Sequence, residues 1–306
     1  MPTLKQLRYL VALAEHLHFR RAAETCCVSQ PTLSGQIKEL EDRLGLKLVN
    51  RDSGKVTLTP MGKEISRHAE NVLDSVHGIV DLAKKQKTRM DETICFGAPP
   101  TLGPYILPYI LPKFQETSAA LKFQMRELYP EMILQNLHDG HLDLALHPLP
   151  VKNTRIECVG LFREPLLMVA SPHHAISKAN HAVHQDLKGE KVLSLDNDPY
   201  LYDPIRDLCA KTDAILSLEY KDTSLDTLRH MVGMNMGVSF FPAMYVRSEI
   251  HNDDRVIVRS FDSKPLYRSI GLAWRRRSKR RDKYLSIAES IRLTMKERVP
   301  EVTVLH

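Results

Sequence analysis

The stretch from residue 19 to residue 44 constrains the fold more than any other part of this 306-residue chain. Small Ala22 and Ala23 let two helices cross closely, and apolar residues recur at helical spacing at Val28, Leu33, Ile37, Leu40 and Leu44. Ser29 can cap the second helix, and Pro31 suits its first turn because the missing amide would be unpaired there anyway. The pattern predicts two short helices joined by a tight turn.

The second helix is polar on the face opposite its apolar stripe. Amide, hydroxyl and ammonium groups on such a face are the groups that meet base edges and phosphates in complexes with DNA. We expect a DNA-contacting set made of Arg20, Arg21, Ser29, Gln30, Pro31, Thr32, Ser34, Gln36 and Lys38. An ordinary helical hairpin is the alternative, because helix-turn-helix patterns are short.

Two short segments with alternating polarity follow, at residues 45–51 and 55–59, with Asp52-Ser53-Gly54 as the turn between them. A period of two residues around such a turn predicts a β-hairpin. This hairpin would be a wing, with Arg51 and Lys55 placed to touch backbone phosphate or the minor groove. A wing favours DNA binding over the ordinary helical hairpin.

Thr59-Pro60-Met61-Gly62 opens a long amphipathic helix. Its apolar residues fall three and four positions apart, at Ile65, Ala69, Val72, Leu73, Val76, Ile79, Val80 and Ala83. A single helix with so long an apolar stripe needs a partner, so the stripe predicts packing against another helix.

The charge of the chain is concentrated at its amino-terminal end. Residues 1–90 contain 15 Lys and Arg against 10 Asp and Glu, so most of the formal net charge of +6 lies in the first third. A basic end suits nucleic acid, although it also suits a solubilising surface.

Several classes of protein are disfavoured. No apolar stretch reaches the roughly 18 residues of a membrane span and no signal peptide is recognisable, so we expect a cytoplasmic protein that is neither membrane-bound nor a transport-type binding protein. Five cysteines, without metal-ligand spacing, argue against structural disulfides, zinc or another metal, and we expect no cofactor. Because no nucleophile with a base and no paired carboxylates are recognisable, we expect no enzyme.

From about Glu92 onward the chain alternates strands and helices. A first βαβαβ set is predicted from strands at 93–97, 121–126 and 142–147 with helices from 103 and over 132–138. A second set is predicted from strands at 192–195, 215–220 and 237–241 with a helix at 224–234, followed by a strand at 268–274 and a helix at 284–299. Such alternation calls for parallel sheets, and two similar halves predict two subdomains around a cleft.

Ligands of open α/β sheets lie beyond the carboxyl ends of strands, near helix amino termini that favour anions. The loops at 99–104, 196–203 and 223–224 meet this condition. The candidate effector-binding residues are Pro100, Thr101, Gly103, Pro130, His147, Tyr200, Tyr202, Thr223 and Ser224. Thr101 can instead be a helix cap, and His147 can instead be a polar residue satisfied within the core.

The motifs Arg-Arg-Ala-Ala, Val-Ser-Gln-Pro-Thr-Leu-Ser, Ile-Lys-Glu-Leu-Glu and Thr-Pro-Met-Gly resemble, in register, those of the LysR-type transcriptional regulators. The resemblance implies an α+β multi-domain fold: a winged helix-turn-helix at 1–60, a linker and dimerisation helix at 61–91, and an effector domain at 92–306. The effector domain would be an α/β domain like a periplasmic binding protein, with subdomain I at 92–163 and 268–306 and subdomain II at 164–267.

The resemblance also implies function and partners. It implies an activator that binds double-stranded DNA at a site with dyad symmetry and contacts RNA polymerase. The subunits would assemble as a homodimer or homotetramer, and the effector domain would sense a small molecule or a redox state.

Further motifs, including Thr-Leu-Gly-Pro-Tyr and Gly-Glu-Lys-Val-Leu, resemble the peroxide-sensing members of this family. In those members a peroxide-reactive cysteine lies nine residues before a resolving cysteine; here Cys209 corresponds to the second and Tyr200 to the first. A phenol cannot attack peroxide as a thiolate does, so we expect that the two-cysteine switch is lost. Two alternatives stay open: Cys209 acts alone as a redox centre, or the chain is a constitutive architectural DNA binder without a ligand.

Overall fold

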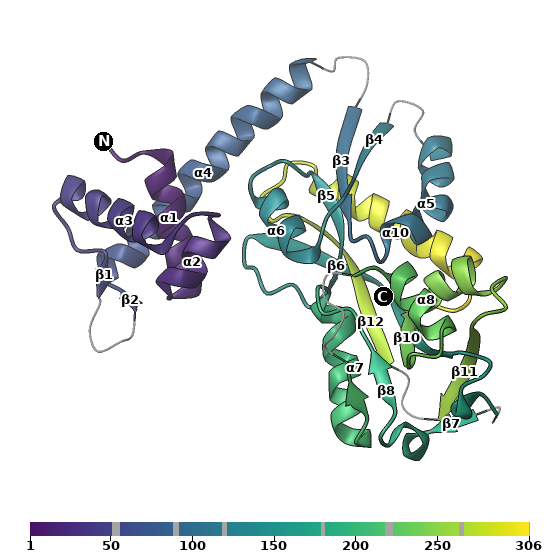
Figure 1. The fold of residues 1–306 in the computed structure, drawn as a ribbon. Helices are drawn as coiled ribbons and strands as arrows, with labels where there is room; N and C mark the ends of the chain where they lie inside the picture. Colours follow the sequence, from purple (N-terminus) through teal and green to yellow (C-terminus); the bar gives the residue numbers. More distant parts are fainter. Residues whose placement is uncertain are drawn as a thin grey trace. The chain divides into compact units, whose positions relative to one another are not determined.

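The computed structural model describes residues 1–50, 56–87, 92–117, 121–178, 181–217, 223–262 and 266–305. The chain forms two compact units, Met1–Arg89 and Met90–His306 (Figure 1). Among the described residues, no helix is both long enough and apolar enough to cross a membrane.

The first unit begins with three helices: α1 (Leu4–His16), α2 (Phe19–Thr25) and α3 (Gln30–Leu44). Ala22 and Ala23 of α2 are buried, as are the side chains with which α3 faces the core, Leu33, Ile37 and Leu40. Val28 and Leu44, at the two ends of the predicted stripe, are half-buried against the same core. The two helices and the turn between them are confirmed, because the apolar spacing puts one face of α3 inside.

Both ends of α3 follow from local chemistry. The hydroxyl of Ser29 accepts a hydrogen bond from the Thr32 amide at 3.3 Å, and Pro31 lies in the first turn. Gly45 ends the helix with φ of 65°, a left-handed conformation that glycine adopts without steric cost. The amino-terminal turn of α3 is therefore held at a defined place in the sequence.

The predicted hairpin is present as β1 (Val49–Asn50) and β2 (Thr57–Leu58), which pair antiparallel with Val49 opposite Leu58. The turn of this hairpin, with Arg51 and Lys55, lies outside the described residues. The wing is therefore seen at its base.

The long helix α4 (Pro60–Lys87) uses its apolar stripe in two ways. Ala69 and Leu73 are buried against Val11 of α1, so the first half of α4 belongs to the core of this unit. Val72 and Ile79 are 44% and 64% exposed. The predicted stripe is thus divided into a buried and an exposed part, and the side chains of Val80 and Ala83 lie outside the described part of the chain.

The second unit is built on a sheet with the strand order β4-β3-β5-β12-β6-β10-β8-β9. At one end, β3 (Glu92–Ala98) pairs parallel with β4 (Leu121–Glu127) and β5 (Leu144–Leu149); at the other, β8 (Lys191–Leu193) pairs parallel with β9 (Ile215–Leu216) and β10 (Val238–Pro242). Two long antiparallel strands, β6 (Ile156–Ala170) and β12 (Leu266–Arg275), run between the two sets. Both parallel sets match the prediction from the βαβ pattern.

Two hydrophobic cores define what we call lobe I and lobe II. Lobe I contains β3, β4 and β5 with the helices α5 (Gly103–Thr117) and α10 (Arg281–Arg298), and α6 (Pro130–His138) packs on the same strands through a smaller cluster with Leu142 and Ala145. Lobe II contains β8, β9 and β10 with α7 (Pro199–Thr212), α8 (Leu225–Gly233), α9 (Ala243–Tyr245), β7 (His181–Val183) and β11 (Ile257–Asp262). The short strand β13 (Thr303–Val304) pairs with β6. Because β6 and β12 pass through both lobes, they are the covalent connection between them (Figure 1).

Two predicted strands differ from the observed ones. The strand predicted at 142–147 begins at Leu144 and continues to Leu149, because the side chain of Asp143 accepts the Cys95 amide at 2.9 Å in place of a strand partner. The strand predicted at 215–220 ends at Leu216, and residues 218–220 lie outside the described part of the chain.

Candidate nucleic-acid interface and effector region

The solvent face of α3 is formed by the polar side chains that its sequence predicts. Gln30, Pro31, Thr32 and Lys38 are exposed, and Ser34 is half-buried beside the apolar stripe. Gln30, Ser34 and Lys38, spaced four residues apart, lie along one side of the helix, from which a helix can present amides and hydroxyls to the major groove.

Some of these polar groups already have partners within the helix. The hydroxyls of Ser29 and Thr32 are 2.7 Å apart, so both take part in capping α3. The amide of Gln36 donates to Glu39 at 2.9 Å, and Glu39 is paired with Arg43. The side-chain amide of Gln36 therefore points along the helix toward Glu39.

The two arginines of α2 are exposed. Arg20 is paired with Glu24 one turn later at 3.1 Å, yet its side chain stays 76% exposed. A surface pair of this kind is weak, so Arg20 can exchange its partner for a phosphate at small cost.

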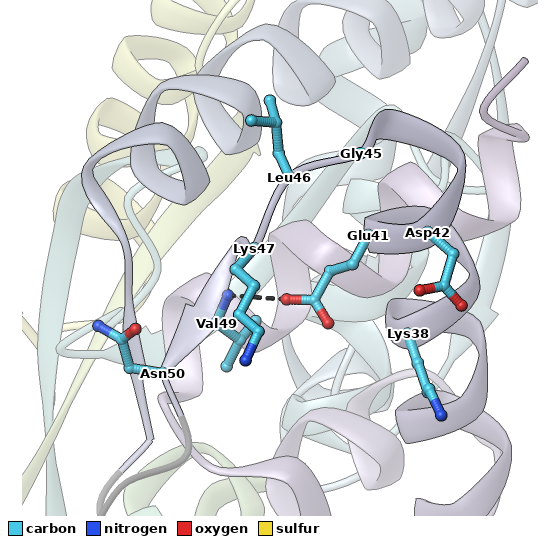
Figure 2. Close-up of a pocket in the computed structure, with 8 residues that line it drawn as sticks. All are labelled: Lys38, Glu41, Asp42, Gly45, Leu46, Lys47, Val49 and Asn50. Atoms are coloured by element: carbon cyan, nitrogen blue, oxygen red, sulfur yellow. Dashed lines mark hydrogen bonds between the residues drawn. The ribbon is translucent and has the colours of Figure 1, made fainter.

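Glu41 is a functional position that the sequence reasoning missed. Its Oε1 accepts hydrogen bonds from the backbone amides of Leu48 and Val49 at 2.8 and 3.1 Å. Figure 2 shows this carboxylate reaching from α3 to the first strand of the wing across an open pocket. Glu41 thereby fixes the base of the wing to the carboxyl-terminal part of α3; an acidic residue on the inner edge of the helix, just before the wing, is the only signal for it in the sequence.

In the second unit, Thr101 is the centre of the predicted effector group. It lies in the loop before α5 and is buried. Its hydroxyl donates to Oδ2 of Asp198 at 3.0 Å and accepts from Nη1 of Arg268 at 2.9 Å, while its carbonyl accepts from Nη2 of the same arginine at 2.8 Å. The helix-cap reading of Thr101 is therefore replaced by a bridging role between lobes I and II.

Arg268 and Glu164 form a buried ion pair that the sequence analysis did not single out. The two residues face each other on β12 and β6, with Nε to Oε2 at 2.7 Å and side chains that are 1% and 0% exposed. Oε1 of Glu164 also accepts the Met244 amide at 2.8 Å. The signal available beforehand was a charge of opposite sign in each of the two segments that cross between the lobes.

His147 is fully buried within β5. Its ring nitrogens lie beside the carbonyl oxygens of Pro148 and Pro130, the latter at 3.2 Å. Burial lowers the pKa of His147 below its ordinary value, since desolvation disfavours the charged ring. These contacts match the reading of His147 as a satisfied polar residue.

Tyr200 lies against His147, with ring centroids 5.6 Å apart at 85°. Its hydroxyl donates to the Pro150 carbonyl at 3.4 Å. Burial raises the pKa of Tyr200 to about 12, so the phenol is neutral.

The structure brings together part of the predicted effector set. Pro130, His147 and Tyr200 are linked through the contacts above, and Thr101 joins them through Asp198, whose Oδ1 accepts the Tyr200 amide at 3.2 Å. Pro100, which precedes Thr101, is half-buried. Gly103 lies close to Ala98: a Cβ added to Gly103 would be 3.2 Å from the Cβ of Ala98. Other members lie apart: Tyr202 stacks with Arg206, Ser224 is exposed and caps α8, and Thr223 joins the group only through its carbonyl, which accepts from Asn197 at 3.3 Å.

Cys209 lies in the core of lobe II and is 3% exposed. Burial raises its pKa to about 11, so the thiol is protonated near neutral pH and is a poor nucleophile. All five cysteines are free thiols, and Cys27, in the turn between α2 and α3, is exposed. Within the described ranges, no group of three or more His, Cys, Asp or Glu side chains is arranged to hold a metal ion.

A winged helix-turn-helix followed by a two-lobed α/β unit with crossing strands defines a class of protein: a DNA-binding transcriptional regulator with an effector domain. Comparison with known families gives the same result. Residues 4–63 match the bacterial regulatory helix-turn-helix proteins of the LysR family, and residues 87–295 match the LysR substrate binding domain. The chain belongs to the LysR family of transcriptional regulators.

Relatives within this family are similar over nearly their whole length. The DNA-binding transcriptional dual regulator OxyR of Escherichia coli is 38% identical over 292 residues, 95% of each chain. A probable hydrogen peroxide-inducible genes activator of Streptomyces viridosporus is 31% identical, covering 97% of this chain and 95% of that protein. A full-length OxyR variant of Pseudomonas aeruginosa has a TM-score of 0.62 at 32% identity, over 95% of both chains.

Proposed function

We propose that this LysR-type regulator is an OxyR-like transcriptional activator without enzymatic activity, acting in the cytoplasm. The amino-terminal residues 1–60 bind double-stranded DNA with α3 in the major groove, residues 61–91 join subunits, and residues 92–306 sense the signal. The observation that supports this most directly is the exposed polar face of α3, with Gln30 and Lys38 free of the core.

Dimerisation is proposed through α4. Val72 and Ile79 lie seven residues apart, hence on one side of the helix, and remain exposed although both are apolar. A second copy of α4 would bury them. Two dimers in a homotetramer would then place two pairs of recognition helices on one promoter, and a change in their spacing would alter DNA bending and contact with RNA polymerase.

The proposed sensing mode differs from a two-cysteine switch. Several relatives are named as hydrogen peroxide-inducible genes activators. In this chain Tyr200 takes the place of the first cysteine, and Cys209 is buried in an uncharged core with a raised pKa. We therefore propose that the signal is a ligand at the lobe contact, or that one conformation is permanent, and that Cys209 does not act as a sensor.

Footprinting tests these proposals together. The purified protein is footprinted on the DNA upstream of its own gene, under reducing conditions and after peroxide. We expect a protected dyad that does not change with peroxide. A footprint that shifts with peroxide, and no longer shifts in Cys209→Ser, would restore the single-cysteine sensor; no protected site would contradict DNA binding at this location.

A further inference from the structure

The residues Asn197-Asp198-Pro199-Tyr200, which we call the latch segment, lie at the amino terminus of α7 in lobe II. Each of its polar side chains reaches lobe I. The amide of Asn197 donates to the Tyr129 hydroxyl at 3.4 Å, the carboxylate of Asp198 accepts from Thr101, and the Tyr200 hydroxyl donates to the Pro150 carbonyl. This short stretch therefore makes three polar contacts with lobe I, in addition to the packing of Tyr105 of α5 on Tyr245 of α9, whose ring centroids are 5.2 Å apart.

Asp198 is the central member of the latch segment. Its Oδ1 accepts the Tyr200 amide at 3.2 Å, which caps α7, and its Oδ2 accepts the Thr101 hydroxyl at 3.0 Å. Capping uses one oxygen and normally takes place at the surface. Capping therefore explains neither the hydrogen bond with Thr101 nor the burial of Asp198, which is 1% exposed.

Beyond Thr101 the hydrogen bonds continue through the connection between the lobes. Arg268 of β12 donates twice to Thr101 and once to Glu164 of β6, and Glu164 accepts the backbone amide of Met244 in α9, whose side chain packs in the core of lobe I. A carboxylate bound to Thr101 thus orders a guanidinium that is part of the crossing strands. Whether a carboxylate is bound beside Thr101 and how β6 and β12 are arranged are therefore coupled through direct hydrogen bonds.

We propose that Asp198 is a tethered ligand: its carboxylate occupies the position beside Thr101 that a free carboxylate effector would need, and it holds the lobes together without any effector. This inference rests on the proposed function, because it assigns the permanent-conformation alternative to a particular residue. Tethering gives the internal carboxylate a high effective concentration, so a free carboxylate does not compete with it. Removal of the Asp198 side chain should leave room for a small carboxylate such as formate.

The test is thermal unfolding of the full chain in sodium formate against sodium chloride at equal ionic strength. We expect formate to raise the melting temperature of Asp198→Ala by about 2 to 4 °C, the shift that about 1 kcal/mol of binding produces in a chain of this size, and to leave the wild type unchanged. Asp203→Ala, which removes an exposed carboxylate of the same helix, is the matched control and should not respond. The double variant Thr101→Val/Asp198→Ala should lose the response.

Two outcomes would overturn the inference: Asp198→Ala that folds but ignores formate, or a wild type that responds as strongly as the variant. If Asp198→Ala does not fold, the volume-conserving changes Thr101→Val and Asp198→Asn test the same contact in a double-mutant cycle. If the melting temperature of the double variant falls by the sum of the losses in the two single variants, the latch is contradicted. A double variant no less stable than the less stable single variant would support it. These measurements need no DNA, so failure of DNA binding and failure of the latch are distinguishable.

Discussion

At the scale of single residues, the contacts of a side chain decide whether it is available for function. Gln30 and Gln36 have the same chemistry and lie on the same helix, but Gln36 donates to Glu39 whereas Gln30 is exposed to solvent. The sequence alone does not distinguish them, because helical spacing gives a direction and does not give a hydrogen-bond partner. The distinction leads to a prediction about DNA recognition.

Gln30→Ala and Ser34→Ala are expected to weaken specific DNA binding by about 1 to 3 kcal/mol each, since a lost base contact has that effect. Gln36→Ala should cost less, because its amide is already engaged within the helix. Binding isotherms on specific and scrambled duplexes measure this, with Gln135→Ala in lobe I as a control for the substitution itself. Equal affinity of the Gln30 and Ser34 variants and the wild type would mean that another face of the unit reads the DNA.

His147 leads to a prediction about pH. Because its folded-state pKa is lowered, the unfolded chain binds a proton at a higher pH than the folded chain, and stability is lost as the pH falls below about 6.5. His147→Gln removes the contribution of His147 to the pH dependence of stability and leaves the neighbouring Asp198 and Tyr200 in place. The free energy of unfolding should therefore fall less in the variant than in the wild type between about pH 7.5 and 5.5 in urea titrations. Parallel pH profiles would contradict the assignment of this dependence to His147.

At the scale of elements, periodicity predicted most of what is observed. The helices α2 to α6, α8 and α10, the base of the wing and both parallel strand sets were predicted from apolar spacing, since burial of one face is what that spacing achieves. Helix α7 was not predicted, and its first residues, from Pro199, fall in the segment 196–203 that was predicted as a loop. The start of β5 was misplaced because the Cys95 amide donates a hydrogen bond to the side chain of Asp143 in place of a strand partner. The base of the wing depends on a carboxylate, Glu41, and on a close approach at Gly62, neither of which periodicity reveals.

Gly62→Ala is expected to destabilise the amino-terminal unit, because an added Cβ would collide with the backbone carbonyl of Leu48. Overpacking of this kind costs typically about 1 to 3 kcal/mol. Gly78→Ala is the matched control in the same helix: its Cβ meets open space, and replacing a helical glycine with alanine stabilises by up to about 1 kcal/mol. Chemical unfolding followed by circular dichroism compares the two. Equal midpoints would show that the chain relaxes around residue 62.

At the scale of the whole molecule, the two lobes are joined by β6 and β12 and by the polar contacts at Thr101. The Arg268 and Glu164 pair is buried on both strands, so its desolvation is offset only while both partners are present. A buried pair of this kind ties the arrangement of the lobes to the crossing strands.

Arg268→Met is expected to lower the stability of the carboxyl-terminal unit by about 3 to 5 kcal/mol, because Glu164 is left charged and buried. The double change Glu164→Leu/Arg268→Met should restore much of this loss, since no unpaired charge remains. Urea midpoints of the wild type, of Arg268→Met, of Glu164→Leu and of the double variant decide the matter. A double variant as unstable as the sum of its single variants would show that the pair is not coupled.

The sequence by itself determined the family, most of the elements and the polar face of α3, because short-range spacing and local capping chemistry specify these directly. Only the tertiary structure decided which side chains act together in the second unit. Thr101, Asp198, Glu164 and Arg268 come from four distant segments, and their contacts exist only because the parallel strand ends and the crossing strands bring them to one place. The physical reason is the sequence separation of the interacting residues. Periodicity is a local property that reports which face of an element is buried, whereas a buried polar contact depends on which side chains from distant segments lie against that face.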